Sequence, residues 1–298
     1  MMKKILNVIR RPYHFFVILN NRGLANWISD KFMVKILYRD VFGRKLNLDS
    51  PKTFNEKMQW LKLYNRKDIY TSYVDKLAVK DIVAKKIGKE YIIPTLKVYD
   101  SINEISLSDL PNQFVLKCTH DSGTVVICSN KKELNFKESK DKLKKRMSEN
   151  YFYRLREWPY KNVKPRIIAE EFINDDKEGQ LKDYKFFCFN GRVKFLKIDF
   201  DRFSNHRANY YDLNMKLLPF GEVDFMPDRN HIEKKPQNFE KMLELAEVLS
   251  EGLPFIRVDF YNVDGKIYFG ELTFFPASGL GKFTDEKWDV EIGNMLEL

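Results

Sequence analysis

Two acidic residues near the end of the chain have the spacing of a divalent-metal site. Asp259 follows Arg257 in one apolar run, Glu271 precedes Thr273 in the next, and an Asp264-Gly265 turn separates the two runs. Carboxylates held on rigid strands beside a cation are the groups that bind Mg²⁺ and phosphate. The sequence therefore predicts a strand hairpin that delivers two carboxylates, a hydroxyl and a guanidinium to one end of the fold.

The turn decides whether the two carboxylates share a face, because side chains alternate along a strand. A two-residue Asp264-Gly265 loop opposes Asp259 to Gly270 and sends Glu271 to the other side. A three-residue loop with a left-handed glycine opposes Arg257 to Glu271 and aligns all four polar side chains. The sequence permits both. The alternative to a metal site is an exposed hairpin whose Arg–Glu pair contributes less than ~1 kcal/mol.

Two earlier segments have residue types that suit a nucleotide. Lys117 ends an apolar strand and precedes a loop of small polar residues, 118–124, whose donors suit phosphate groups. This loop has neither the Walker A nor the Rossmann glycine pattern, and hairpin loops often contain such residues. Glu170 and Glu171 end a second apolar run, 167–169, where they could meet ribose hydroxyls and an adenine amine. A charged strand end is the alternative there.

Basic and aromatic side chains gather in the middle of the chain. Five polar residues fall in and after a predicted hairpin, namely Lys185, Lys197, Arg202, His206 and Arg207. They could neutralise a transferred phosphate or hold an anionic acceptor, and an ordinary basic surface is the alternative. The aromatic and basic stretch 151–166 is similar to a sugar or nucleic-acid contact surface, or to an aromatic lid packed on the core.

The elements that must position these residues follow one another in an α+β order. Thr53 and Glu56 have the spacing of a capping box at the start of a helix. We expect further helices at 73–87, 136–149 and 239–251. We expect short strands at 91–94, 96–99, 114–117, 125–128 and 166–169, and a hairpin of 183–189 with 192–200. Helices followed by mostly antiparallel strands favour an α+β fold over a doubly wound sheet.

The composition is that of a basic globular chain. With 298 residues and a formal net charge of +10, it can form two ordinary domains and attract nucleotides or acidic glycans. Three cysteines without CxxC spacing do not favour a disulfide scaffold or a structural zinc site. No run approaches the ~20 apolar residues of a membrane span. The basic and apolar N-terminus fits either a packed helix or an amphipathic segment on a membrane surface.

The order of these motifs along the chain resembles that of the ATP-grasp superfamily. Their amino-acid residues closely resemble those of its TupA-like branch, found in polysaccharide and teichuronopeptide biosynthesis. The resemblance covers about residues 50 to 285. The segments that carry it are Thr53-Phe54-Asn55-Glu56-Lys57, Asp75-Lys76, 114–124, 167–173, Asp183-Tyr184-Lys185-Phe186 and 257–279.

The resemblance implies an ATP-grasp fold, in which two α+β lobes with antiparallel sheets enclose the nucleotide after a helical N-terminal segment. The implied divisions are a helical segment 1–50, on the membrane surface in one interpretation, a helical preATP-grasp region 51–110, a small lobe 111–172, and a large lobe 173–298 with the metal site. The implied nucleotide-binding residues are Lys76, Lys117, Ser122, Gly123, Glu170, Glu171, Phe172 and Ile173.

The resemblance also assigns the metal and the chemistry. Asp259 and Glu271 would hold Mg²⁺, and Thr273 stands where the superfamily often has an Asn ligand. The implied catalytic residues are Arg257, Lys185 and Arg207. ATP would activate a carboxylate as an acyl phosphate, and an amine would then attack it to form an amide.

The expected partners are ATP with Mg²⁺, an acidic sugar of a surface glycan, and an amino acid or amine, with no nucleic acid. We expect a cytoplasmic location, at the inner face of the membrane if the basic N-terminus binds there. A glycosyltransferase using Asp199-Phe200-Asp201, or a sugar kinase, is the main alternative. A non-enzymatic basic glycan- or nucleic-acid-binding protein would leave Asp259 and Glu271 without a role.

Overall fold

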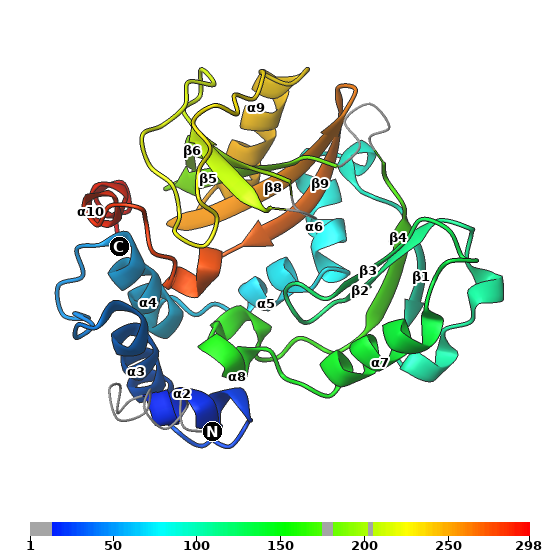
Figure 1. Ribbon diagram of the computed structural model, residues 1–298, viewed down its shortest axis with the longest axis horizontal. Coiled ribbons are helices and arrows are strands. Elements are labelled where there is room, and N and C mark those ends of the chain that lie inside the picture. Colours follow the sequence, from blue (N-terminus) through cyan, green and yellow to red (C-terminus); the bar gives the residue numbers. More distant parts are fainter. Residues whose placement is uncertain (1–13, 175–180, 202–204) are drawn as a thin grey trace.

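The computed structural model describes residues 14–174, 181–201 and 205–298. Residues 1–13 of the predicted N-terminal segment 1–50, and Arg202, lie outside these residues. Two antiparallel sheets face each other across the molecule, a four-stranded sheet of order β1-β4-β2-β3 and a five-stranded sheet of order β7-β6-β5-β8-β9 (Figure 1). This arrangement confirms the predicted α+β class. No helix in the described ranges is long and apolar enough to cross a bilayer.

The described part of the chain begins with α2 (His14–Asn21), α3 (Asp30–Phe42) and α4 (Phe54–Tyr64). The predicted capping box begins α4, since the Thr53 hydroxyl accepts from the Glu56 N–H and the Glu56 carboxylate accepts from the Thr53 N–H. Helix α4 packs on the C-terminal part of the chain, with the ring of Phe54 5.2 Å from that of Phe255. Helix α10 (Lys287–Asn294) lies against it.

The next region contains two helices where the sequence predicts one. The expected helix 73–87 is two helices, α5 (Ile69–Val74) and α6 (Ala78–Ile87). They are separated because the Asp75 carboxylate accepts hydrogen bonds from the N–H groups of Leu77 and Ala78, at 2.9 and 3.3 Å, and so caps α6. The break places Lys76 between the two helices, where its N–H donates to the Thr119 carbonyl.

The smaller sheet follows α6. Its strands are β1 (Thr95–Tyr99), β2 (Phe114–Cys118), β3 (Val125–Cys128) and β4 (Ile167–Glu171). Helix α7 (Phe136–Met147) packs on β2, and α8 (Phe152–Leu155) contacts α2 (Figure 1). Short 3-10 turns cover Lys89–Tyr91, Ile102–Glu104, Leu107–Asp109 and Trp158–Tyr160. The strand expected at 91–94 is not formed, because this segment begins in one of those turns; only its last residue, Pro94, bonds a described strand, since its carbonyl accepts from the Glu171 N–H at 3.1 Å.

The larger sheet contains most of the polar side chains of interest. Its strands are β5 (Asp183–Phe189), β6 (Arg192–Phe200), β7 (Arg207–Tyr211), β8 (Phe255–Val263) and β9 (Lys266–Thr273), and a short turn, η5 (Pro276–Gly279), follows. Helix α9 (Phe239–Ser250) covers one face, where Phe239 contacts Phe186. Because side chains alternate, residues 183, 185 and 187 of β5 point to the opposite face, toward the smaller sheet. The predicted hairpin of 183–189 and 192–200 is confirmed, whereas β7 was not predicted.

Candidate active site

The closing hairpin turns through two residues. Val263 is paired with Lys266, so the loop is Asp264-Gly265, with φ angles of 50° and 85°. Two consecutive positive φ angles are those of a type I′ turn, the turn whose twist matches a two-residue hairpin. The shorter of the two predicted loops is therefore the one that forms.

The predicted consequence of that loop is wrong, because a β-bulge restores the alignment. Phe260 opposes Phe269, but the next pair is Asp259 with Glu271, so Gly270 is the extra residue of β9. A Cβ atom at position 270 would lie 3.0 Å from the Asp259 carbonyl oxygen, a close approach that favours glycine at this position. The bulge therefore brings Asp259 and Glu271 to one face.

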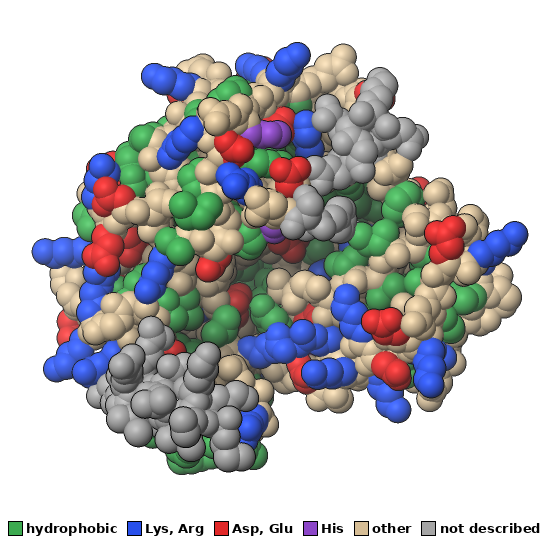
Figure 2. All heavy atoms as spheres, viewed as in Figure 1, with side chains coloured by type: hydrophobic (Ala, Val, Ile, Leu, Met, Phe, Trp, Pro, Cys, Tyr) green, Lys and Arg blue, Asp and Glu red, His purple; other side chains and the backbone are tan. Residues whose placement is uncertain are grey.

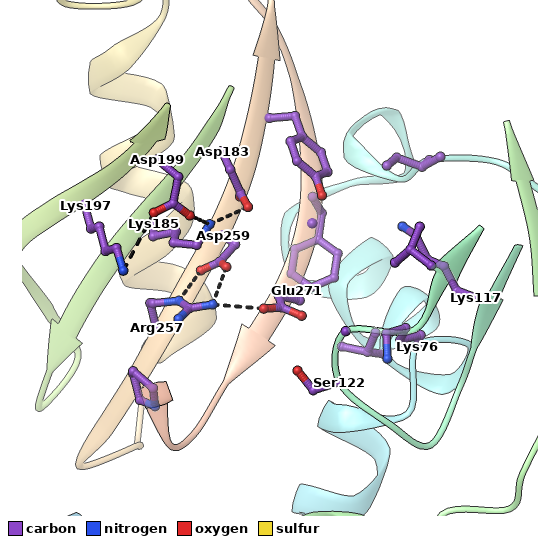
Figure 3. A pocket seen from close by; sticks show the side chains of 18 of the residues that line it. Lys76, Lys117, Ser122, Asp183, Lys185, Lys197, Asp199, Arg257, Asp259 and Glu271 are labelled. Carbon is purple, nitrogen blue, oxygen red and sulfur yellow. Dashed lines mark hydrogen bonds and ion pairs between the residues drawn. The ribbon is translucent and has the colours of Figure 1, made fainter. Parts of the chain in front are cut away.

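These carboxylates belong to a row of charges that crosses four strands. Lys197 of β6 opposes Lys185 of β5, Lys185 opposes Asp259 of β8, and Asp259 opposes Glu271 of β9. All four side chains line one cavity of about 390 Å³ (Figure 3). The row therefore presents two ammonium groups beside two carboxylates on a rigid sheet.

The guanidinium of Arg257 holds the carboxylates together. It donates to both carboxylate oxygens of Asp259, at 2.7 and 2.6 Å, and to Glu271 Oε1 at 2.9 Å. The two contacts of Nη2 place one oxygen of each acid within 5.5 Å of the other, the sum of those distances. Thr273 Oγ1 accepts from Arg257 at 3.0 Å and donates to Glu271 at 3.1 Å.

Two carboxylates and a hydroxyl at this separation fit the hard oxygen ligands of Mg²⁺. Glu271 is the more accessible acid, with 42% of its side chain exposed against 2% for Asp259. Within the described residues, no three His, Cys, Asp or Glu side chains are grouped so that they could hold a metal ion alone. A metal at this site would therefore need further ligands, such as phosphate oxygens and water.

Burial and neighbouring charge act differently on the two acids. Burial raises the pKa of Asp259 to about 7, against the opposing effects of Arg257 and Lys185. Burial also acts to raise the pKa of Glu271, but Arg257, Lys76 and Lys185 outweigh it and hold that pKa below its usual value. Because Lys76 comes from the other side of the cavity, the two lobes share one electrostatic environment.

The cavity is also lined by three lysines, Lys76, Lys80 and Lys117. Figure 3 shows Lys76 and Lys117 on the wall opposite the carboxylates. The Glu170 carboxylate forms ion pairs with the ammonium groups of Lys80 and Lys117, the latter at 2.6 Å. Burial opposes ionisation of Glu170, but Lys117 and Lys80 outweigh it and lower its pKa. Lys80 was missed from the sequence; it lies four residues after Lys76, and helical spacing beside a suspected phosphate ligand could have indicated it.

The predicted loop residues Ser122 and Gly123 line the same cavity. The Ser122 hydroxyl points into the space between the lobes, across from Glu271 (Figure 3). Lys76 reaches this loop as well, because its ammonium donates to the Asp121 carbonyl. The loop and Lys76 therefore lie on one wall of the cavity.

An adjoining cavity of about 690 Å³ shares Lys117 and Glu170 with the first. Its walls include the predicted hinge residues Glu171, Phe172 and Ile173. Several other lining residues are apolar, and the polar side chains of Ser129, Asn174 and His206 complete the wall; the apolar ones include Ile93, Val115, Val125 and Ile127. A largely apolar space with a few polar side chains in its wall has the character of a site for a planar base.

Two predicted site residues lie apart from these walls. Arg207 lines neither cavity, and its guanidinium is 3.7 Å from the Asp228 carboxylate. Its assignment as a catalytic residue therefore stays a prediction. Thr273 also lines neither cavity and takes part through Arg257 and Glu271.

The sequence missed several acids on the floor of the first cavity. Lys185 forms ion pairs with Asp183 and, at 2.7 Å, with Asp199. Lys197 contacts Asp199 at 3.7 Å and Glu222 at 2.5 Å. Asp199, the first acid of the suspected glycosyltransferase motif, is therefore a buried ion-pair partner of two lysines.

Two antiparallel lobes, a lysine-lined cavity between them and paired carboxylates on the larger sheet define a nucleotide-dependent enzyme of the ATP-grasp class. The family model for TupA-like ATPgrasp matches residues 56–297, and the chain therefore belongs to the TupA-like ATP-grasp family of ATP-dependent ligases. The resemblance and the fold predicted from the sequence are confirmed.

Solved structures of ATP-grasp ligases are similar at low identity. D-alanine–D-alanine ligase from Helicobacter pylori is 17% identical, with a TM-score of 0.40 over 83% of this chain and 70% of that one. The Bacillus anthracis D-alanine–D-alanine ligase is 13% identical, with a TM-score of 0.39 over 69% and 58%. The ATP-grasp ligase PsnB, complexed with minimal precursor, Mg and ADP, is 9% identical, with a TM-score of 0.39 over 86% and 65%.

The chain thus spans between 58% and 70% of the lengths of these three proteins. No curated protein matches the sequence.

Proposed function

We propose that this chain is an ATP- and Mg²⁺-dependent carboxylate–amine ligase. It would join an amino acid or amine to an acidic sugar of a cell-surface polysaccharide through an acyl phosphate. The observation that carries the proposal is the alignment of Asp259 and Glu271 around Arg257, in a cavity also lined by three lysines.

The lysines provide the phosphate-binding side of the proposed site. Lys76, Lys80 and Lys117 converge on the cavity, while Glu170 balances part of their charge. An incoming triphosphate would meet Lys80 and Lys117 already held in place by Glu170, so these two ammonium groups would need little reorganisation to bind it. The adjoining apolar cavity beside the 171–173 segment would receive the base.

Asp259 and Glu271 would hold Mg²⁺, with the Thr273 hydroxyl orienting Glu271. When bound, the metal would neutralise charge on the transferred phosphoryl group. Arg257 fixes the two carboxylates before any ligand arrives, so the site does not have to reorganise. Arg257 lines the cavity, so it would also provide a positive charge beside the reacting phosphate.

The far half of the first cavity would receive the acceptor. Lys185 and Lys197 lie there beside Glu222 and Asp199, so an acidic sugar would meet ammonium donors and carboxylate acceptors together. An acceptor carboxylate oxygen would attack the γ-phosphorus, and the bond to the β–γ bridging oxygen would break to release ADP. The amine would then attack the acyl carbon and release phosphate, losing its proton.

Product stoichiometry tests this proposal. The protein is incubated with Mg²⁺, ATP, a uronic-acid oligosaccharide and mixed amino acids, and ADP, phosphate and new amide are measured together. One ADP and one phosphate per amide is the expected result. ADP with a phosphorylated sugar and no amide would indicate a kinase instead, and a nucleoside diphosphate released from a nucleotide sugar would indicate a glycosyltransferase.

Neither alternative is favoured by a specific contact. Asp199, which a DxD-type metal site would need, is engaged with Lys185 and Lys197. A kinase would use the same ATP site and differ in its acceptor. A non-enzymatic binding role does not account for the paired carboxylates, and we expect no nucleic-acid partner. We propose a cytoplasmic location, where ATP is available.

A further inference from the structure

The beginning of the chain is strongly segregated in charge. Its first 29 residues contain no Asp or Glu, although these make up 42 of the 298 residues and an even spread would place about four there. The same stretch contains five cations, Lys3, Lys4, Arg10, Arg11 and Arg22. This segment therefore attracts anionic surfaces regardless of the mixed charge elsewhere.

Four large apolar side chains are exposed on the helical hairpin formed by α2 and α3, residues 14–42. Phe15, Leu24, Trp27 and Phe32 belong to α2, α3 and the loop between them, and Trp27 is 83% exposed. The Trp27 indole N–H donates to the Leu24 carbonyl at 3.0 Å, so its polar group is satisfied within the hairpin while the ring faces outward. Such a ring is suited to a boundary between water and an apolar layer.

These side chains are not displaced parts of the core. The hairpin has its own buried cluster, formed by Ala25, Ile28, Met33 and Leu37, which attaches it to the rest of the protein. Helices α2 and α3 lie at the edge of the molecule, away from both sheets (Figure 1). The space-filling view shows hydrophobic side chains at this edge, next to atoms drawn in grey (Figure 2).

The charges beside the exposed residues are positive. Arg22, Lys31 and Lys35 are exposed on the hairpin. The first acid of the chain, Asp30, is already engaged by Arg66 at 2.9 Å and Arg156 at 3.3 Å. It therefore offers little compensation to the cations around it.

We propose that the α2–α3 hairpin docks on an anionic membrane surface. Phe15, Leu24, Trp27 and Phe32 enter the headgroup region, while the exposed cations contact lipid phosphates and carboxylates. The two acids of the hairpin, Asp30 and Asp40, are both paired with basic side chains. Exposed basic charge combined with exposed aromatic rings on short amphipathic helices is the pattern of an interfacial rather than a spanning segment. The inference concerns a surface remote from the cavity and does not depend on the proposed ligase reaction.

Vesicle partitioning of the full chain tests this surface. We expect sedimentation with vesicles of phosphatidylcholine and phosphatidylserine, little with phosphatidylcholine alone, and release as salt is raised. Trp27→Ser should weaken partitioning at least about tenfold, because a large apolar ring is lost. Arg22→Gln and Lys31→Gln should each weaken it about fivefold, the effect of one cation near an anionic surface.

Matched control variants distinguish docking through this hairpin from non-specific adsorption to vesicles. Ile232→Ser changes a side chain as exposed as Leu24, each at 58%, and Lys137→Gln removes an exposed cation from α7. Both should partition like the unaltered protein. Circular dichroism and thermal unfolding establish that every variant is folded, and quenching of Trp27 fluorescence by brominated lipid, absent in Trp27→Phe, reports its depth.

Three results would overturn the proposal. One is no sedimentation with anionic vesicles at low salt. Another is equal partitioning of Trp27→Ser and the unaltered protein. The third is a lipid-independent dimer abolished by Trp27→Ser, with no vesicle binding, which would make the hairpin an interface between two copies of the chain.

Discussion

Replacing Glu271 by Gln should separate catalysis from folding. The side chain is 42% exposed and contacts Arg257 at 2.9 Å, while Arg257 keeps both of its bonds to Asp259. A partly exposed ion pair contributes about 0–1 kcal/mol, so the free energy of unfolding should change by no more than that. The loss of a metal-ligating carboxylate should raise the catalytic barrier by about 3 kcal/mol, or roughly a hundredfold in rate.

Asp259→Asn provides the contrast. Asp259 is 2% exposed and forms a bidentate pair with Arg257, so its charge cannot be replaced by water. Breaking a buried pair of this kind costs about 3–5 kcal/mol, and this variant should lose stability as well as activity.

The assays are ADP release with Mg²⁺ and ATP, and urea unfolding followed by circular dichroism. Thr273→Val is a control that keeps both acids and removes one hydroxyl. ATP turnover by Glu271→Gln at the level of the unaltered protein would refute the metal assignment. An equal loss of stability in Glu271→Gln and Asp259→Asn would refute the distinction between an accessible ligand and a buried one.

Three further changes follow from the same contacts. Glu170→Gln should destabilise the protein by about 3 kcal/mol at neutral pH, because Lys80 and Lys117 lose their buried partner. The neighbouring lysines lower the pKa of Glu170 from its ordinary 4.5, so this stabilisation is present above pH 4.5 and is lost as the pH falls through the folded-state pKa. Urea unfolding at several pH values should therefore show the stabilities of the variant and the unaltered protein converging in acid. A difference in stability that does not change with pH would contradict this. Lys117→Ala should weaken ATP binding about tenfold or more in calorimetric titrations, and unchanged affinity would exclude it from the phosphate site. Gly270→Val should lower stability by about 1–3 kcal/mol and reduce Mg²⁺-dependent ATP turnover, because its Cβ would press on the Asp259 carbonyl; an unchanged unfolding midpoint would show that the bulge tolerates a side chain.

The register of the closing hairpin shows how far the sequence could predict the site. The acidic residues and the turn at Asp264-Gly265 could be predicted from the sequence, because a turn depends on local residue preferences. The β-bulge at Gly270 was not, since an extra residue in one strand is fixed by packing against its neighbour. The loop was therefore predicted as one of two alternatives, and the conclusion drawn from it was wrong.

The break between α5 and α6 has a similar cause. The apolar spacing of 73–87 favours one continuous helix, but the Asp75 carboxylate caps a new helix at Leu77 and Ala78. Lys80 then falls in the first turn of α6, four residues after Lys76, which lies just before that helix. The acids at 183, 199 and 222 depend on cross-strand pairing and loop packing, for which the sequence has no local signal.

Phosphoryl transfer to a carboxylate is the central claim, and isotope transfer tests it most directly. A uronic-acid acceptor with oxygen-18 in its carboxylate is incubated with the protein, Mg²⁺, ATP and an amine, and the phosphate is analysed by mass spectrometry. The proposal predicts one oxygen-18 atom in each phosphate released with ADP, at full label. ATP-dependent amide formation with unlabelled phosphate would contradict it.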